Sequence, residues 1–227
     1  MTAKAQVVTG LGIMRLEGQD RPDLLLLLSL VAVILVHPAL DHGDLRRLAL
    51  GALTFVPVLI ATFRLSGMKG WLRPAILLMS SALVFSAAAL IWPTPAIEGI
   101  RWAVLGAFFA LTVAALFSYL TNARATTNMH LYTAASTYLL LGFLWFALYS
   151  SLDAFYPGVI KLSHAGNDRS SELLYFSLVT LSTIGYGDVV PLSGEVRMLA
   201  ALEGLTGVLY IAITVALLIS GYKAREE

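Results

Sequence analysis

The sequence contains no cysteine, and charged side chains make up only 13% of its 227 residues. Without cysteine the chain has no disulfide framework, thiol nucleophile or thiolate metal site. The formal net charge is only +1 and the basic residues are scattered, which argues against a nucleic-acid partner. There is no G-x-S-x-G elbow, no Walker loop and no i, i+4 pair among the four histidines, so we do not expect an enzyme or a histidine metal site.

Apolar residues are abundant: they make up 58% of the chain, and the mean hydropathy is +0.81. Soluble domains are about half apolar and about a quarter charged. A bilayer core about 30 Å thick is crossed by a helix of about 20 apolar residues. We therefore predict an all-α integral membrane protein with six transmembrane helices, over residues 23–39, 46–63, 74–93, 101–120, 130–153 and 197–221.

One further apolar segment, residues 171–182 (SELLYFSLVTLS), is too short to be a span. It lies between the fifth and sixth predicted spans, which favours a re-entrant helix. Ser170 or Ser171 can cap its N-terminus, with Glu172 in the first turn. The negative end of its dipole then points to the segment that follows it.

That following segment, TIGYGD at residues 183–188, has two glycines two positions apart. Glycine allows backbone angles closed to other residues, so consecutive carbonyls can all point one way. An ion that crosses a bilayer must exchange its water shell for such oxygens. Polar backbone is tolerated at membrane depth where it is enclosed in protein or lines a water-filled path. The sequence therefore predicts an ion filter here.

The run TLSTIGYGDVVP, with YFSLV directly before it, resembles the pore of potassium channels, and the resemblance extends over residues 130–221. It differs from the commonest version of the filter by Ile184 in place of valine. The resemblance implies that K⁺ is the permeant ion and that four identical subunits form each filter, since one chain supplies a quarter of the ring. It implies K⁺ coordination by the backbone carbonyls of Thr183, Ile184, Gly185 and Tyr186, with the Thr183 hydroxyl closing the innermost site.

The residues around the filter are expected to support it. The resemblance places Gly187 at the outer mouth and Asp188 behind the filter strand as a brace. Many potassium channels have a tryptophan at the second of two aromatic positions in the pore helix, where this chain has Tyr175 and Phe176. Because Phe176 cannot donate the hydrogen bond that such a tryptophan gives, filter rigidity and slow inactivation are expected to differ.

Glu203 lies about two turns inside the sixth predicted span, where an ionised carboxylate costs several kcal/mol unless it is paired or hydrated. We therefore expect it to face protein or water. Our hypothesis is that Glu203 forms hydrogen bonds behind the filter, to Thr180 or Ser182, and influences filter stability. The alternative is a structural, protonated residue with no part in gating.

The inner helix of potassium channels bends at a glycine, and Gly207 lies at the matching distance behind the filter, so the resemblance implies a gating hinge at Gly207. The alternative role for Gly207 and the nearby Gly204 is tight helix packing. On this alignment an apolar cavity, which could close by dewetting, is lined by Val208, Ile211, Ala212 and Val215.

The fourth predicted span, WAVLGAFFALTVAALFSYL, contains no charge, and Arg101 marks its outer end. Steep voltage gating is therefore not expected. We divide the chain into a cytoplasmic segment (1–22), a four-helix bundle without sensor charges (23–125) and a pore domain (126–227). The short tails suggest no cytoplasmic regulatory domain, as in prokaryotic six-span channels, and leave room for a separate regulatory partner.

The basic residues flanking the spans predict a multi-pass protein of the cell membrane with both termini in the cytoplasm, because this orientation puts nine of the fifteen basic residues on the cytoplasmic side. Three alternatives to a K⁺-selective channel remain. A channel of low Na⁺/K⁺ selectivity usually alters the residues after the first filter glycine, which are retained here. A K⁺ transporter whose pore is formed within one subunit needs about four filter-like repeats per chain, and this sequence has one. A receptor or scaffold that uses the bundle alone leaves the filter sequence unexplained.

Overall fold

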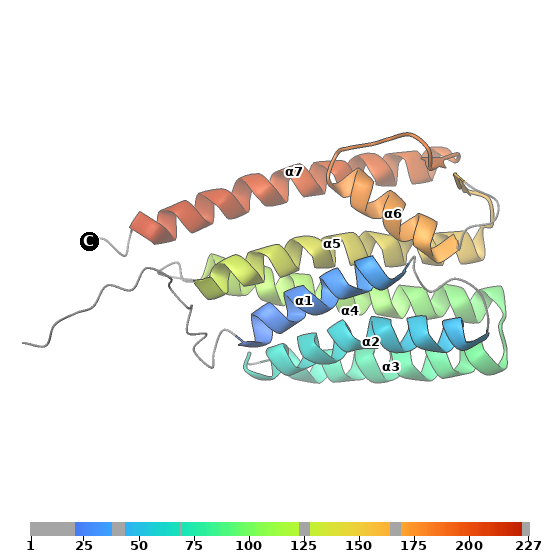
Figure 1. The fold of residues 1–227 in the computed structure, drawn as a ribbon, viewed down its shortest axis with the longest axis horizontal. Helices are drawn as coiled ribbons and strands as arrows, with labels where there is room; N and C mark the ends of the chain where they lie inside the picture. Colours follow the sequence, from blue (N-terminus) through green and yellow to red (C-terminus); the bar gives the residue numbers. More distant parts are fainter. Residues whose placement is uncertain (1–20, 38–43, 69, 123–127, 164–168, 224–227) are drawn as a thin grey trace, which may run out of the picture.

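The computed structural model describes residues 21–37, 44–68, 70–122, 128–163 and 169–223 (Figure 1). These residues form an all-helical structure with one short pair of strands, which confirms the predicted all-α class. The helices are α1 (Arg21–Val36), α2 (Asp44–Ser66), α3 (Leu72–Ile91), α4 (Pro95–Thr121), α5 (Asn128–Phe155), α6 (Arg169–Leu181) and α7 (Gly194–Lys223).

The six long helices lie where the six spans are predicted, and α6 lies at the predicted re-entrant segment. Among the described residues, α3, α4, α5 and α7 are long and apolar enough to cross a bilayer. Apolar stretches in the other two are shorter, over Pro22–Val36 in α1 and Thr54–Ser66 in α2. The predicted segment 1–22 lies almost entirely outside the described residues.

Local capping explains why α4 begins before the predicted residue 101. The Thr94 hydroxyl accepts a hydrogen bond from the Ile97 amide at 3.3 Å, and Pro95 occupies the first helical turn. Arg101 is therefore inside the helix and does not mark its end. It forms an ion pair with Glu98 at 2.5 Å, one turn earlier. No other charged residue occurs in α4.

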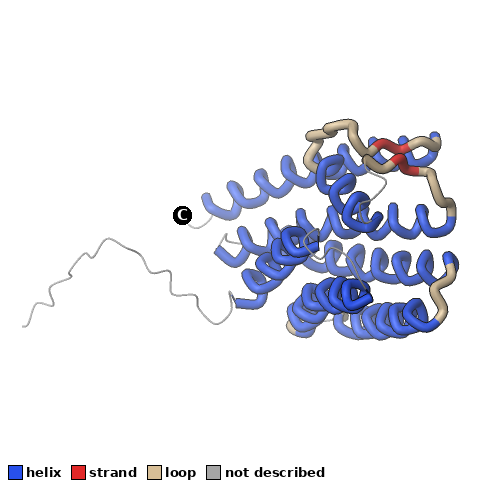
Figure 2. Tube along the Cα trace, turned by 45° about the vertical axis from the view of Figure 1, so that its right-hand side comes forward, coloured by secondary structure: helices blue, strands red, loops and turns tan. Residues whose placement is uncertain are grey.

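Helix α5 lies at the centre of the fold, between α7 on one side and α1 and α4 on the other (Figures 1 and 2). The most extensive helix pairing is that of α4 with α5. The interface between α4 and α5 is aromatic and buried. Phe109 of α4 packs against Phe143 of α5 with ring centroids 5.9 Å apart, and Phe143 packs against Phe146 of the same helix at 6.4 Å. Because α4 is packed along its own α5, it cannot slide without breaking this core.

Helix α6 packs between α5 and α7, at the end of the fold where α5 ends and α7 begins (Figure 1). Strand β1 (Ile160–Lys161) pairs antiparallel with β2 (Val190–Pro191). The Leu192 amide extends this link by donating to the Val159 carbonyl at 2.8 Å. The segment that follows the predicted filter is thereby tied to the loop that precedes α6.

Candidate functional site

The C-terminus of α6 closes in a Schellman motif, which begins the predicted filter. The Ile184 amide donates to the Val179 carbonyl at 3.0 Å, and the Thr183 amide to the Thr180 carbonyl at 2.9 Å. The residue that such a motif holds in the left-handed region is usually glycine. Here it is Thr183, with φ of 59°. A β-branched residue in this region costs about 1–3 kcal/mol, so the surrounding contacts hold Thr183 there.

Positive φ recurs at every second residue of the filter segment. After Thr183 at 59° come Gly185 at 59° and Gly187 at 80°, whereas Ile184 and Tyr186 between them have negative φ. This alternation distinguishes the segment from a β-strand. It is the backbone freedom for which the paired glycines are expected, because non-glycine residues rarely adopt these angles.

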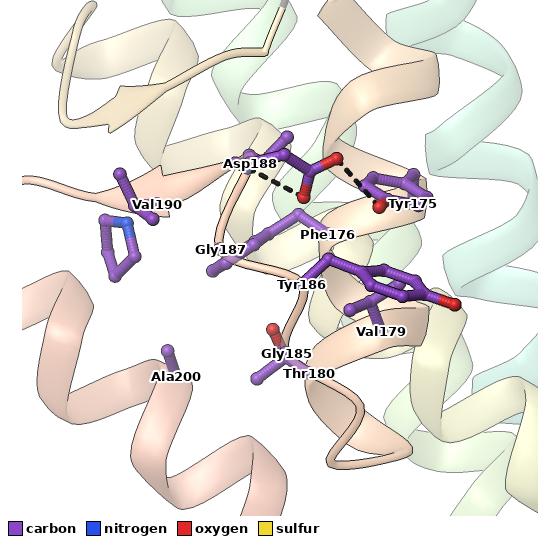
Figure 3. Close-up of a pocket in the computed structure, with 12 residues that line it drawn as sticks. Tyr175, Phe176, Val179, Thr180, Gly185, Tyr186, Gly187, Asp188, Val190 and Ala200 are labelled. Atoms are coloured by element: carbon purple, nitrogen blue, oxygen red, sulfur yellow. Dashed lines mark hydrogen bonds between the residues drawn. The ribbon is translucent and has the colours of Figure 1, made fainter.

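The C-terminal end of the filter segment is anchored to α6 (Figure 3). The Tyr175 hydroxyl donates a hydrogen bond to the Asp188 carboxylate at 2.8 Å, and the other oxygen of that carboxylate accepts from the Val189 amide at 3.0 Å. The rings of Tyr175 and Tyr186 are parallel, with centroids 6.4 Å apart. Tyr175 thus provides a polar link to the filter from the aromatic position that precedes Phe176, which is itself buried against Tyr149.

A cavity of about 220 Å³ lies between α6, the filter segment and the start of α7 (Figure 3). Phe176, Val179 and Thr180 line it from α6, and Ala200 lines it from α7. The filter contributes residues from Gly185 to Asp188. The filter segment therefore stands away from α7, and the side chains of Ile184 and Tyr186 are 56% and 69% exposed.

Glu203 is fully buried behind α6, with 0% exposure. Its partners are not the predicted ones. Its carboxylate contacts the Ser177 hydroxyl at 2.6 Å and accepts from the Tyr149 hydroxyl at 2.8 Å. The Ser182 hydroxyl instead donates to the Leu178 carbonyl of its own helix at 2.7 Å, which turns it away from Glu203. The prediction of Thr180 or Ser182 as partner is therefore wrong.

The N-terminus of α6 also differs from the prediction. The helix begins at Arg169, so Ser170 and Ser171 lie inside its first turn and do not precede it. The Ser171 hydroxyl contacts Nδ1 of His37, at the end of α1, at 2.8 Å. Arg169 forms an ion pair with Asp153 of α5. Both contacts fix the N-terminal end of α6 to neighbouring helices.

Gly207 lies where α7 crosses the end of α6. A Cβ atom at this position would lie 2.0 Å from the Leu181 carbonyl oxygen, so no side chain fits without a shift of the backbone. The same oxygen accepts a hydrogen bond from the Tyr138 hydroxyl of α5 at 3.3 Å. Helix α7 is unbroken through Gly207. This geometry gives Gly207 a packing role against α6, and the gating hinge at Gly207 stays a prediction.

The predicted cavity-lining residues of α7 form an exposed apolar face on the single chain. Exposure is 53% for Val208, 50% for Ile211 and 49% for Val215, and Ala212 is also exposed. No described helix of the same chain covers them. They are available to face a pore, lipid or another subunit.

Three hydroxyl groups near the filter were not predicted as site residues: those of the buried Tyr149 and Ser177 and of the half-buried Tyr138. Tyr138 and Tyr149 occur in an α5 sequence whose apolar positions give no periodic signal. Their contacts depend on how α5, α6 and α7 are packed. The one sequence feature that pointed to these hydroxyl groups was Glu203, because a buried carboxylate requires polar partners.

Residues 133–222 match a family model described as "Ion channel". A "Two pore potassium channel b" of Oryza sativa subsp. japonica is 38% identical over 71 residues, which cover 31% of this chain and 18% of that protein. The "A-type voltage-gated potassium channel KCND3" of Rattus norvegicus is 30% identical over 126 residues, covering 52% of this chain and 19% of that protein. The chain thus spans less than a fifth of the length of these relatives. No solved structure matches it significantly.

Residues 133–222, which run from α5 to α7 and include the filter segment, form an ion-channel domain. This domain is similar to the corresponding part of potassium channels, as the sequence resemblance implies, and the family model that it matches describes ion channels and not enzymes.

Proposed function

We propose that the chain is the subunit of a homotetrameric, K⁺-selective channel that conducts K⁺ passively through a central pore. The observation that carries this proposal is the alternating sign of φ from Thr183 to Gly187, between fixed ends. The Schellman motif fixes the inner end, and the bond from Tyr175 to Asp188 fixes the outer end.

In the assembled channel the carbonyls of residues 183–186 replace the hydration shell of K⁺, and the Thr183 hydroxyl closes the innermost site. One chain leaves Ile184 and Tyr186 more than half exposed beside an open cavity. Three further copies of the chain would cover these side chains and complete the ring. The apolar face of α7 then lines the inner cavity.

We further propose that all six long helices cross the cell membrane with both termini in the cytoplasm. Residues 126–227 form the pore domain, and the bundle over residues 23–125 surrounds it. The pairing of α4 with α5 makes the bundle a fixed support for the pore. The shorter α1 can span with its flanking residues in the interface.

The proposal is tested by a flux assay on liposomes loaded with K⁺ and diluted into Na⁺. Efflux of K⁺ drives proton uptake through an added ionophore, which a pH-sensitive dye reports. Gly185→Ser is expected to abolish the signal, because serine disfavours φ of 59° in the filter. Gly158→Ser is the matched control: Gly158 has φ of 90° and equally open surroundings, but lies outside the filter.

Flux in the wild type and in Gly158→Ser, with none in Gly185→Ser, supports the proposal. Equal signals from K⁺-loaded and Na⁺-loaded liposomes, each diluted into a large impermeant cation, would favour the channel of low selectivity. Wild-type flux that survives Gly185→Ser would contradict a pore through this filter. The mass of the purified complex, measured in detergent, distinguishes four copies from any other number and so tests the tetramer.

A further inference from the structure

Glu203 is at the centre of a chain of hydrogen bonds that joins three helices. The Tyr149 hydroxyl of α5 donates to one carboxyl oxygen of Glu203 at 2.8 Å. The other carboxyl oxygen lies 2.6 Å from the Ser177 hydroxyl of α6. The same hydroxyl lies 2.8 Å from the Gly142 carbonyl of α5. All three distances are those of O–H···O hydrogen bonds.

Three hydrogen bonds need three protons, and the two hydroxyl groups supply only two. The Tyr149 proton is used on Glu203. If the Ser177 proton is directed to Glu203, nothing lies between the Ser177 oxygen and the Gly142 carbonyl, and two acceptors face each other at 2.8 Å. If Ser177 donates to Gly142, the third proton must come from the carboxyl group.

Nothing else in the described surroundings of Glu203 balances a negative charge. Its side chain is fully buried, and no described Lys, Arg or His forms an ion pair with it. The titratable groups that face it are the phenols of Tyr149 and Tyr138, both on α5. An unpaired carboxylate at this depth is costly, whereas a carboxylic acid with both oxygens hydrogen-bonded is not.

We infer that Glu203 is a neutral carboxylic acid whose proton is donated to Ser177, closing a chain from Tyr149 through Glu203 and Ser177 to the Gly142 carbonyl. Glu203 is a positioning residue. It fixes α6 against α5 and α7 at Ser177, two residues before Val179, whose carbonyl accepts from the amides of Ile184 and Gly185. The protonation does not depend on the proposed function, but the effect on current does.

Loss of this proton would break the chain at a defined point. Ser177 would turn its proton to the carboxylate, the bond to Gly142 would be lost, and a negative charge would remain behind α6. Deprotonation at alkaline pH is therefore expected to loosen the helix that carries the filter. Glutamine at position 203 keeps the size and donates from its amide, so it reproduces the neutral acid.

The proton is tested by infrared spectroscopy of the full chain in lipid at neutral pH. We expect the carbonyl stretch of a protonated acid, lost in Glu203→Gln and shifted in Ser177→Ala. Glu195→Gln, at an exposed position near the start of the same helix, is the matched control and is expected to retain the band. A wild type without this band, or a band that survives Glu203→Gln, overturns the inference. This measurement needs no current, so it separates the inference from the proposed function.

The positioning role is tested by thermal unfolding and K⁺ current. Glu203→Gln is expected to keep wild-type stability and selectivity at neutral pH, and to remove any loss of current at alkaline pH. Glu203→Ala is expected to lose both stability and current, because the buried Tyr149 hydroxyl is left without its acceptor and Ser177 keeps only its bond to Gly142. If Glu203→Gln fails in the same way as Glu203→Ala, the glutamate is needed as an anion and the inference is wrong.

Discussion

The hydroxyl of Tyr175 donates to the carboxylate of Asp188 at 2.8 Å, so the middle of α6 holds the outer end of the filter segment. This bond is outside the filter backbone and can be removed without changing it. Tyr175→Phe is expected to weaken the anchor by about 1 kcal/mol, the net value of a typical hydrogen bond. We expect K⁺ current that decays faster during sustained activity, with selectivity retained.

The time course of current in planar bilayers measures this effect. Tyr156→Phe is the matched control, since Tyr156 is 64% exposed and lies outside the filter. Equal decay in the wild type and in both variants would show that the anchor does not stabilise the filter.

The hydrogen bond between Tyr175 and Asp188 is expected to depend on pH. Partial burial, and next the hydrogen bond to Asp188, raise the pKa of Tyr175 to about 12. The neutral phenol is the form that donates, so its contribution is full below about pH 10, the pKa of a free tyrosine, and is lost as pH rises through 12. The rate at which K⁺ current decays should therefore differ between the wild type and Tyr175→Phe by a constant amount from pH 6 to pH 9. A difference that disappears within that range would assign the titration elsewhere.

Gly207 and Gly204 lie one turn apart on α7. Substituting each by alanine distinguishes a loss of close packing from a loss of backbone flexibility. A Cβ atom at Gly207 would lie 2.0 Å from the Leu181 carbonyl oxygen, whereas one at Gly204 would lie 3.6 Å from the Thr180 oxygen, an ordinary contact. Gly207→Ala is expected to lower stability by about 1–3 kcal/mol, and Gly204→Ala to leave it nearly unchanged. Thermal unfolding of the purified complex measures both. If Gly207→Ala keeps full stability but alters channel opening, Gly207 is a hinge.

The ion pair between Asp23 and Arg64 joins α1 to α2 at 2.7 Å, and Arg64 also lies over the Tyr119 ring of α4. Asp23 is fully buried, so Arg64→Met removes the guanidinium from a buried carboxylate and is expected to cost about 3–5 kcal/mol. The double variant Asp23→Asn with Arg64→Met should recover most of this loss. Thermal unfolding of the single and double variants measures this recovery. If the stability losses of the two single variants simply add in the double variant, Asp23 and Arg64 are not coupled.

Voltage should have little effect on opening. The only charges in α4 are Glu98 and Arg101, which pair with each other near its start. Each elementary charge moved across the membrane supplies about 2.3 kcal/mol per 100 mV, and α4 has no unpaired charge to move. Open probability measured over a range of voltages is expected to change only gradually. A steep sigmoidal curve would show that another charged element senses the field.

The sequence predicts the elements of this fold well because apolar length determines them. It also locates α6, since a 12-residue apolar segment between two spans has few other places to lie. The unpredicted features depend on how helices meet. Glu203 bonds to Ser177 and Tyr149 because of the register of α7 against α6 and α5, which no local pattern encodes. The left-handed Thr183 was missed for another reason: glycine is the residue that normally signals this conformation.

The reversal potential tests the central claim most directly. It is measured for reconstituted protein with K⁺ on one side of the bilayer and mostly Na⁺ on the other, for the wild type, Gly185→Ser and Gly158→Ser. We predict a reversal close to the K⁺ equilibrium potential for the wild type and Gly158→Ser, with no selective current in Gly185→Ser. A robust wild-type current that reverses near zero would contradict a K⁺-selective filter at residues 183–188.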